Sequence, residues 1–204
     1  MRGIYNFVIT PINGRYKNTK KIDDKELILN TQIYNHQFVN REALVLETPV
    51  INDTGIQKGD TIIVHHNVFR RYHDMKGVEK NGHAHYKDDK YFVYSDQVYM
   101  YKRNGKCHAL KGYTFIKPIE SNDIFSISKE NELIGIVKYT DSTDFKVGDL
   151  VGFGPNSEFE FVVEGERLYR VLTPAITINY EYQGNEKEYN PSWAHSSWRI
   201  NKGS

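Results

Sequence analysis

The chain contains the stretch Lys58-Gly59-Asp60-Thr61-Ile62-Ile63-Val64 and, later, the stretch Val147-Gly148-Asp149-Leu150-Val151-Gly152-Phe153. In both, a Gly-Asp pair leads directly into an apolar run. Glycine adopts positive φ without steric cost and aspartate bonds to nearby backbone, so each pair predicts a tight turn into a buried strand. A charged turn and a second apolar run follow each stretch, at 88–101 and 164–178. This shared order predicts that one supersecondary unit is used twice.

The correspondence extends outward from the two Gly-Asp pairs. Phe7–Ile12 resembles Phe115–Ile119, because each is a strand-like run that reaches a proline. Ala43–Leu46 likewise corresponds to Ile134–Val137, ahead of the second pair. The sequence therefore predicts three parts: a first domain over 1–112, a second, shorter domain over 113–182, and an extended tail over 183–204.

Composition favours strands over helices. The chain has 15 Tyr and 10 Phe in 204 residues, and its apolar runs are short and bounded by turn-forming residues. This pattern is typical of an all-β sandwich or small barrel, so we predict an all-β fold. The Tyr, Asn and Lys content also fits an AT-rich genome, as in many phages.

Charge and cysteine content narrow the function classes. Lys and Arg number 27 and Asp and Glu 26, so no overall field draws the chain to nucleic acid or to an acidic membrane. The single cysteine, Cys107, allows no internal disulfide and favours a reducing compartment. No apolar run is long enough to span a bilayer as a helix. We expect a cytoplasmic protein.

The first domain is longer than the second for two reasons. It carries a polar loop over 13–31 and an insertion over 69–87. Near the end of the loop, Leu27, Ile28 and Leu29 are three consecutive apolar residues beside a charged stretch. Such a segment suits ordering on binding, since burial of its side chains offsets the entropy lost. The other interpretation is an ordinary strand of the first domain.

These motifs together resemble the GroES-type co-chaperonin family. Lys146–Asp149 is similar to the family's entry into its central strand, Glu164–Tyr169 to its acidic turn and next strand, and Thr173–Ile176 to its last short turn. Phe7–Thr10 resembles the opening strand, and Leu27–Thr31 the hydrophobic tripeptide of the mobile loop. The resemblance implies two tandem GroES-like small β-barrels followed by an extended arm.

The resemblance also implies a function. It makes Leu27, Ile28 and Leu29 the residues that bind the ring of a GroEL-type chaperonin. It further implies self-association into a ring or other homo-oligomer, with no cofactor and no enzymatic activity. Asp23–Glu26 stands where the family has glycines, and the second domain has no long loop with a matching tripeptide between Pro118 and Leu133. At most one docking loop per chain is therefore expected.

A second function from a different class stays open. A phage or virion structural protein, acting in assembly, head or neck, would use the same barrel without chaperone activity. In that case the insertion over 69–87 and the tail with Trp193 and Trp198 would form assembly contacts. Leu27–Leu29 would then be core.

Other chemistries are less favoured by the sequence. Histidines gather around the insertion, and His83-Ala84-His85 has a usable ligand spacing, yet no cysteine or acidic motif completes a metal site, so no metal is predicted. Lys and Arg in the insertion alternate with acidic residues, so nucleic-acid binding is unlikely. Cys107 and His108 are neighbours on an expected strand and point to opposite faces, which excludes a nucleophile–base pair. The histidines in question are His65, His66, His73, His83, His85 and His108.

Overall fold

The computed structural model describes residues 3–17, 19–22, 25–28, 35–36, 38–123, 125, 127–180, 182 and 184–196, and for 19–22, 25–28, 195 and 196 the backbone alone. The chain divides into two compact units, Met1–Cys107 and His108–Ser204. The division lies five residues before the predicted boundary at 112, inside strand β11 (Lys106–Ala109).

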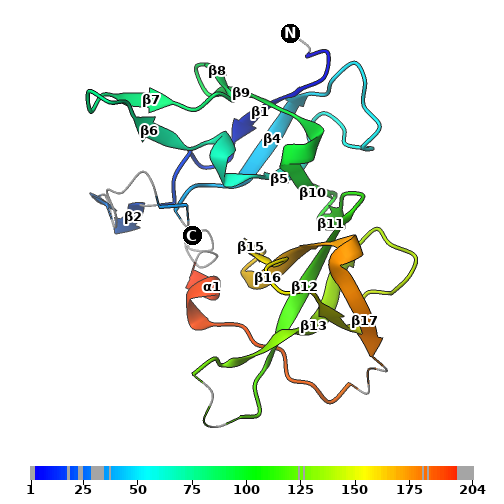
Figure 1. Cartoon of the computed structure of the whole chain (residues 1–204). Helices are drawn as coiled ribbons and strands as arrows, with labels where there is room; N and C mark the ends of the chain where they lie inside the picture. Colours follow the sequence, from blue (N-terminus) through cyan, green and yellow to red (C-terminus); the bar gives the residue numbers. More distant parts are fainter. Residues whose placement is uncertain are drawn as a thin grey trace. The chain divides into compact units, whose positions relative to one another are not determined.

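The first unit is built on a seven-stranded sheet (Figure 1). Its hydrogen-bonded order is β11-β10-β5-β4-β1-β9-β8. The pairs β1–β4, β1–β9, β4–β5, β5–β10 and β8–β9 are antiparallel. The strands are β1 (Phe7–Pro11), β4 (Glu42–Glu47), β5 (Thr61–Val64), β8 (His85–Lys87), β9 (Lys90–Val93), β10 (Val98–Arg103) and β11 (Lys106–Ala109).

The second unit is built on a six-stranded sheet in the order β15-β16-β12-β13-β14-β17 (Figure 1). Its strands are β12 (Tyr113–Glu120), β13 (Glu130–Thr140), β14 (Leu150–Phe153), β15 (Phe159–Val163), β16 (Glu166–Leu172) and β17 (Ile176–Tyr180). Single 3-10 turns occur at His66–Val68, Ser95–Gln97 and Thr173–Ala175, and one α-helix, α1, spans Ser192–Ser196. The all-β prediction is confirmed.

The two sheets share one strand order. The first sheet contains the order β8-β9-β1-β4-β5-β10, and the second sheet has the order β15-β16-β12-β13-β14-β17. Matched position by position, each strand of the first series has the same rank along the chain as its counterpart in the second, so that β1 corresponds to β12 and β4 to β13. A 3-10 turn joins β9 to β10, and another joins β16 to β17. Within the described residues no pairing joins the two ends of either sheet, so each order is open.

The two Gly-Asp pairs form the same turn. Gly59 and Gly148 have φ of 91° and 96°, which explains the need for glycine. Gly59 N donates to Val45 O at 2.8 Å, and Val45 N donates to Asp60 O at 2.9 Å. In the second unit, Gly148 and Asp149 bond Val137 with the same geometry at 2.8 and 2.9 Å.

The carboxylate of each aspartate closes its own turn. Asp60 Oδ2 accepts from Gln57 N at 2.7 Å, and Asp149 Oδ2 accepts from Lys146 N at 2.8 Å. In each turn the aspartate lies three residues after the backbone N–H that its carboxylate accepts from, which explains why aspartate follows the glycine. The predicted turns into buried strands are therefore present at both places, since Ile62, Val64 and Val151 are fully buried.

The strand register corrects one predicted correspondence. Ala43 lies opposite Ile62, and Gly135 lies opposite Val151. Ile62 and Val151 each follow their aspartate by two residues, so Ala43 is equivalent to Gly135 and not to Ile134. The sequence match was displaced by one residue, because apolar runs without an internal marker do not fix register.

Apolar side chains of each sheet form that unit's own core. In the second unit, Ile116, Val137, Val151 and Val171 are completely buried, and Phe145 packs with them from the segment before the Gly-Asp turn. Ile9, Val45 and Ile62 are buried at the matching places of the first unit, and Ile56 is buried before its turn.

Three further segments lie outside these sheets. β2 (Thr19–Ile22) and β3 (Lys25–Ile28) pair as a hairpin, and β6 (Arg71–His73) and β7 (Glu79–Asn81) pair as another. In the predicted tail, residues 184–191 form no strand or helix apart from a bridge between Glu188 and Ile119, and α1 follows. That short helix was not predicted.

Candidate functional site

The loop between β1 and β4 leaves the first unit through a hydrogen-bonded stem. Lys17 N donates to Phe38 O at 2.7 Å, and Asn40 N donates to Arg15 O at 2.9 Å. Tyr16 and Val39 form a β-bridge between these two bonds. The two ends of the loop are therefore held together at its base.

Asn40 fixes the start of this stem. The residue is fully buried, and its Nδ2 donates to Ile12 O at 2.5 Å and to Gly14 O at 2.7 Å. Its Oδ1 accepts from Glu42 N at 3.0 Å. Every polar atom of the amide is thus used in setting the direction in which the loop departs. No pattern in the sequence identifies Asn40, since its partners are backbone atoms up to 28 residues away.

Two of the three predicted docking residues lie in the β2–β3 hairpin of this loop. Leu27 and Ile28 belong to β3, where their backbones pair with Lys20 and Thr19 of β2. Leu29 lies outside the described residues. The β2–β3 hairpin forms a sheet of its own, so Leu27 and Ile28 are not part of a strand of the seven-stranded sheet.

The insertion is anchored on the loop stem. Arg15 Nε donates to Phe69 O at 3.1 Å, and Arg15 Nη1 donates to Asn81 Oδ1 at 2.6 Å. Arg71 N donates to the Tyr16 hydroxyl at 2.8 Å, and the Arg71 guanidinium lies 4.8 Å from the centre of the Tyr16 ring. These contacts fasten the β6–β7 hairpin to the base of the loop.

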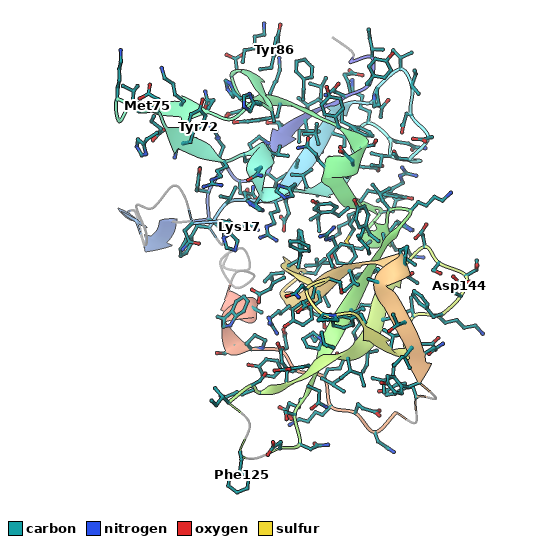
Figure 2. The ribbon with its side chains drawn as sticks, in the orientation of Figure 1. Lys17, Tyr72, Met75, Tyr86, Phe125 and Asp144 are labelled. Carbon is teal, nitrogen blue, oxygen red and sulfur yellow. The ribbon has the colours of Figure 1, made fainter. Side chains whose placement is uncertain are left out.

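The hairpin itself carries paired charges and exposed apolar groups. Arg71 pairs with Glu79 at 2.6 Å, and Lys80 lies 3.9 Å from Asp74. These pairs neutralise cations that a nucleic-acid groove would keep available for phosphates. Met75 at the turn is completely exposed, and Figure 2 shows it at the outer end of the hairpin.

Three histidines cluster beside the stem. His65 and His66 stack with ring centres 4.2 Å apart, and the His36 ring lies 5.5 Å from that of His66. Burial, together with the nearby His65 and Arg41, lowers the pKa of His66 to about 4. Since His66 stays neutral near pH 7, the stack is a packing contact at that pH.

The other histidines of the insertion are dispersed. The ring of His85 packs edge-on against Tyr91 at 5.3 Å, and its Nε2 lies 2.9 Å from Asp88 O. His83 is exposed. In the part of the chain that the structure describes, no group of three or more His, Cys, Asp or Glu side chains is placed to hold a metal ion.

The second unit holds a buried acid–base network that sequence reasoning missed. Arg167 Nε donates to Glu160 at 2.8 Å, and its Nη1 and Nη2 both bond the Glu130 carboxylate. The Tyr169 hydroxyl accepts from Arg167 at 2.6 Å and donates to Glu130. Glu130 is the first residue of β13, so this network secures one end of the β12–β13 connection.

The network shifts two pKa values in ways that keep it intact. Burial and the bond to Glu130 raise the pKa of Tyr169, so its phenol stays protonated. Burial opposes the charge of Arg167, but hydrogen bonds to Glu130 and Glu160 outweigh burial and raise its pKa. Both carboxylates are bound to one guanidinium, which suits a structural clamp.

The tail secures the other end of the same connection. Glu120 N donates to Lys187 O at 2.6 Å, and the Lys187 ammonium pairs with the Glu120 carboxylate at 2.8 Å. Tyr189 N donates to Pro118 O at 2.8 Å. Of the two tail indoles, Trp193 is half exposed on α1, and Trp198 lies outside the described residues.

Two remaining residues bear on catalysis. Cys107 and His108 are adjacent in β11, where neighbouring side chains point to opposite faces.

Among the described residues, no helix is long and apolar enough to cross a membrane. Comparison of the chain with protein-family models, with curated proteins and with solved structures finds no match.

Proposed function

We propose that the chain is a non-enzymatic, cytoplasmic protein of co-chaperonin type. Its two units are duplicated copies of a GroES-like β-barrel module, with sheets that are open in their described residues, and they assemble with other copies into a ring or another homo-oligomer. The loop between β1 and β4 docks on the ring of a GroEL-type chaperonin through Leu27, Ile28 and Leu29. The observation that carries this proposal is the hydrogen-bonded stem, which projects an apolar-bearing loop away from the sheet of a unit whose strand order occurs twice.

The duplication is supported by agreement at several levels. Strand order, the two Gly-Asp turns and the placement of a 3-10 turn before the last shared strand all correspond. Pro11 lies opposite Ala43, and Pro118 lies opposite Gly135, so the prolines also occupy matching places. Two unrelated all-β units could share a strand order without sharing the same backbone hydrogen bonds at one turn, so the matching turns support duplication.

The docking mechanism follows from the stem. A loop whose ends are fixed loses less conformational entropy on binding than a free segment of the same length. Burial of three aliphatic side chains in an apolar groove contributes about 1.5–3 kcal/mol each. A binding segment built in this way needs no change in the sheet that carries it.

The test is co-elution of the purified protein with a GroEL-type ring in ADP. The wild type is expected to co-elute, and Leu29→Asp is expected to lose association while keeping the wild-type melting temperature. Met75→Asp is the matched control, because Met75 is an equally apolar but fully exposed residue of another hairpin. Failure of the wild type to co-elute contradicts the proposal, and unfolding of Leu29→Asp assigns Leu29 to a core.

One observation favours the virion structural alternative. Tyr72, Met75 and Val78 are exposed by 43%, 105% and 50% on the anchored β6–β7 hairpin, which is a suitable assembly contact (Figure 2). Stoichiometric presence of the protein in virions, together with loss of assembly in Met75→Asp, would establish that role instead.

A further inference from the structure

A short turn at the end of β5 is closed by a histidine side chain. The 3-10 turn His66–Val68 follows β5, and His65 is its N-terminal cap. Nδ1 of His65 accepts a hydrogen bond from Asn67 N at 3.1 Å, and Val68 N donates to His65 O at 3.0 Å. A protonated imidazole has donors only, so this cap requires that Nδ1 of His65 is unprotonated.

Three imidazole rings and one phenol ring gather around the cap. The rings of His65 and His66 stack with their centres 4.2 Å apart, and the His36 ring lies 5.5 Å from that of His66. The ring of Tyr99, in β10, packs edge-on against His65 at 6.3 Å. Two titratable rings are therefore in direct contact, and a third lies beside them.

The charged neighbours of His66 are basic as well. Burial lowers the pKa of His66 most, and the charges of His65, Arg41, His36 and Arg70 lower it further, to about 4 in total. Arg41 and Arg70 are cationic at every pH at which a histidine titrates. Protonation of a stacked ring therefore places like charges close together, which destabilises the closed turn.

The turn leads directly into the contacts that anchor the β6–β7 hairpin. Phe69 is the C-terminal cap of the turn, and its carbonyl accepts from Arg15 Nε of the loop stem at 3.1 Å. Two residues later, Arg71 N donates to the Tyr16 hydroxyl at 2.8 Å. Opening of the turn therefore displaces the backbone groups that hold the hairpin against the stem.

We propose that the His65–His66 turn is a pH-sensitive latch, which releases the β6–β7 hairpin from the loop stem when its imidazoles become protonated. In acid, His65 no longer accepts from Asn67 N, and the stacked rings repel each other and the guanidinium groups beside them. The turn opens, and the contacts of Phe69 and Arg71 with the stem are lost. The latch acts within the first unit and is independent of any chaperonin.

Proton linkage gives the direction and the size of the effect. The pKa of His66 is about 4 in the closed turn, against an ordinary value of 6.5, so between these pH values the open turn binds more protons. The closed turn is therefore favoured at pH 7 and loses population as the pH falls. At pH 5 the open population is expected to rise about tenfold, after allowance for the partial exposure of the ring.

Amide hydrogen exchange of the full chain at pH 7 and pH 5 tests the latch. Rates are expressed as protection factors, which remove the intrinsic effect of pH on exchange. In the wild type, peptides covering 66–82 are expected to lose about tenfold in protection at pH 5, whereas β4 and β5 keep theirs. His66→Gln is expected to abolish this loss. His83→Gln, at an exposed site, is the matched control and is expected to behave like the wild type.

A second variant separates the cap from the charge. In His65→Asn, the side-chain oxygen can still accept from Asn67 N but does not titrate. This variant is expected to keep wild-type protection at pH 7 and to show a smaller loss at pH 5.

Each outcome decides for or against the latch. A loss of protection over 66–82 in the wild type that is absent from His66→Gln supports it. Equal protection at both pH values in the wild type overturns it, as does an undiminished loss in His66→Gln. A loss that extends equally over β4 and β5 also overturns it, because global unfolding would then account for the exchange. If His66→Gln is already unprotected at pH 7, His65→Asn decides, and an undiminished loss in that variant contradicts the latch.

Discussion

The turn that enters β5 and the turn that enters β14 share their backbone bonds, but their carboxylates have different surroundings. Asp60 is 5% exposed and bonds the Arg103 guanidinium at 2.9 and 2.6 Å. Asp149 is half-buried, and among the described residues its carboxylate accepts one bond from beyond its own turn, from the Asn179 amide at 3.3 Å. The comparison indicates that the backbone geometry defines the module, whereas side chains from the last strand determine how strongly each turn is held.

The largest difference between the units in the stability cost of a substitution is expected at the equivalent positions Ala43 and Gly135. A Cβ on Gly135 would lie 2.4 Å from Lys117 O and 2.6 Å from Ile116 Cγ2, so β12 leaves no room for a side chain there, whereas Ala43 carries a methyl group at the equivalent place of the first unit. Gly135→Ala is expected to cost about 3 kcal/mol by overpacking. Ala43→Gly, its counterpart, is expected to cost about 1 kcal/mol. Calorimetric unfolding of the two variants measures both costs, and equal costs would contradict the expected clash at Gly135.

The two aspartates give the next largest difference. Asp60→Ala removes hydrogen bonds of a buried carboxylate and is expected to cost about 2–3 kcal/mol. Asp149→Ala removes one turn bond in a partly exposed place and is expected to cost about 1 kcal/mol. Urea unfolding of both variants measures the gap. If Asp149→Ala costs as much as Asp60→Ala, the bond to Arg103 contributes nothing.

The smallest effect concerns the histidine stack, which the second unit lacks in its described residues. The pKa of His66 is about 4 in the folded chain and 6.5 when unfolded, so between these values the unfolded state binds more protons. Stability is expected to fall by about 1 kcal/mol as the pH drops from 7 to 4, after allowance for partial exposure. His66→Gln is expected to remove this part of the pH dependence, whereas the control His83→Gln, at an exposed site, is expected to retain it. Thermal unfolding of both variants across this pH range checks the prediction, and an unchanged pH dependence in His66→Gln would contradict it.

Some of these features were accessible from the sequence. The Gly-Asp turns could be predicted, because a positive φ and a bond between the aspartate and nearby backbone are local requirements that restrict the residue type. The all-β fold was accessible from the short apolar runs between turn residues. Register was not, and the equivalence of Ala43 with Gly135 emerged only from strand pairing.

The parts of the site that were missed depend on distant partners. Arg167 lies 37 residues from Glu130, and Asn40 lies 28 residues from Ile12. No local pattern identifies such pairs.

Hydrogen–deuterium exchange of the full chain, alone and with an ADP-bound GroEL-type ring, tests most directly whether the loop between β1 and β4 docks. The account predicts slower exchange in peptides covering 25–31 in the complex, with β5 and β14 unchanged. Protection at 69–87 with the 25–31 peptides unaffected, or unchanged exchange throughout the chain at saturating ring, would contradict it.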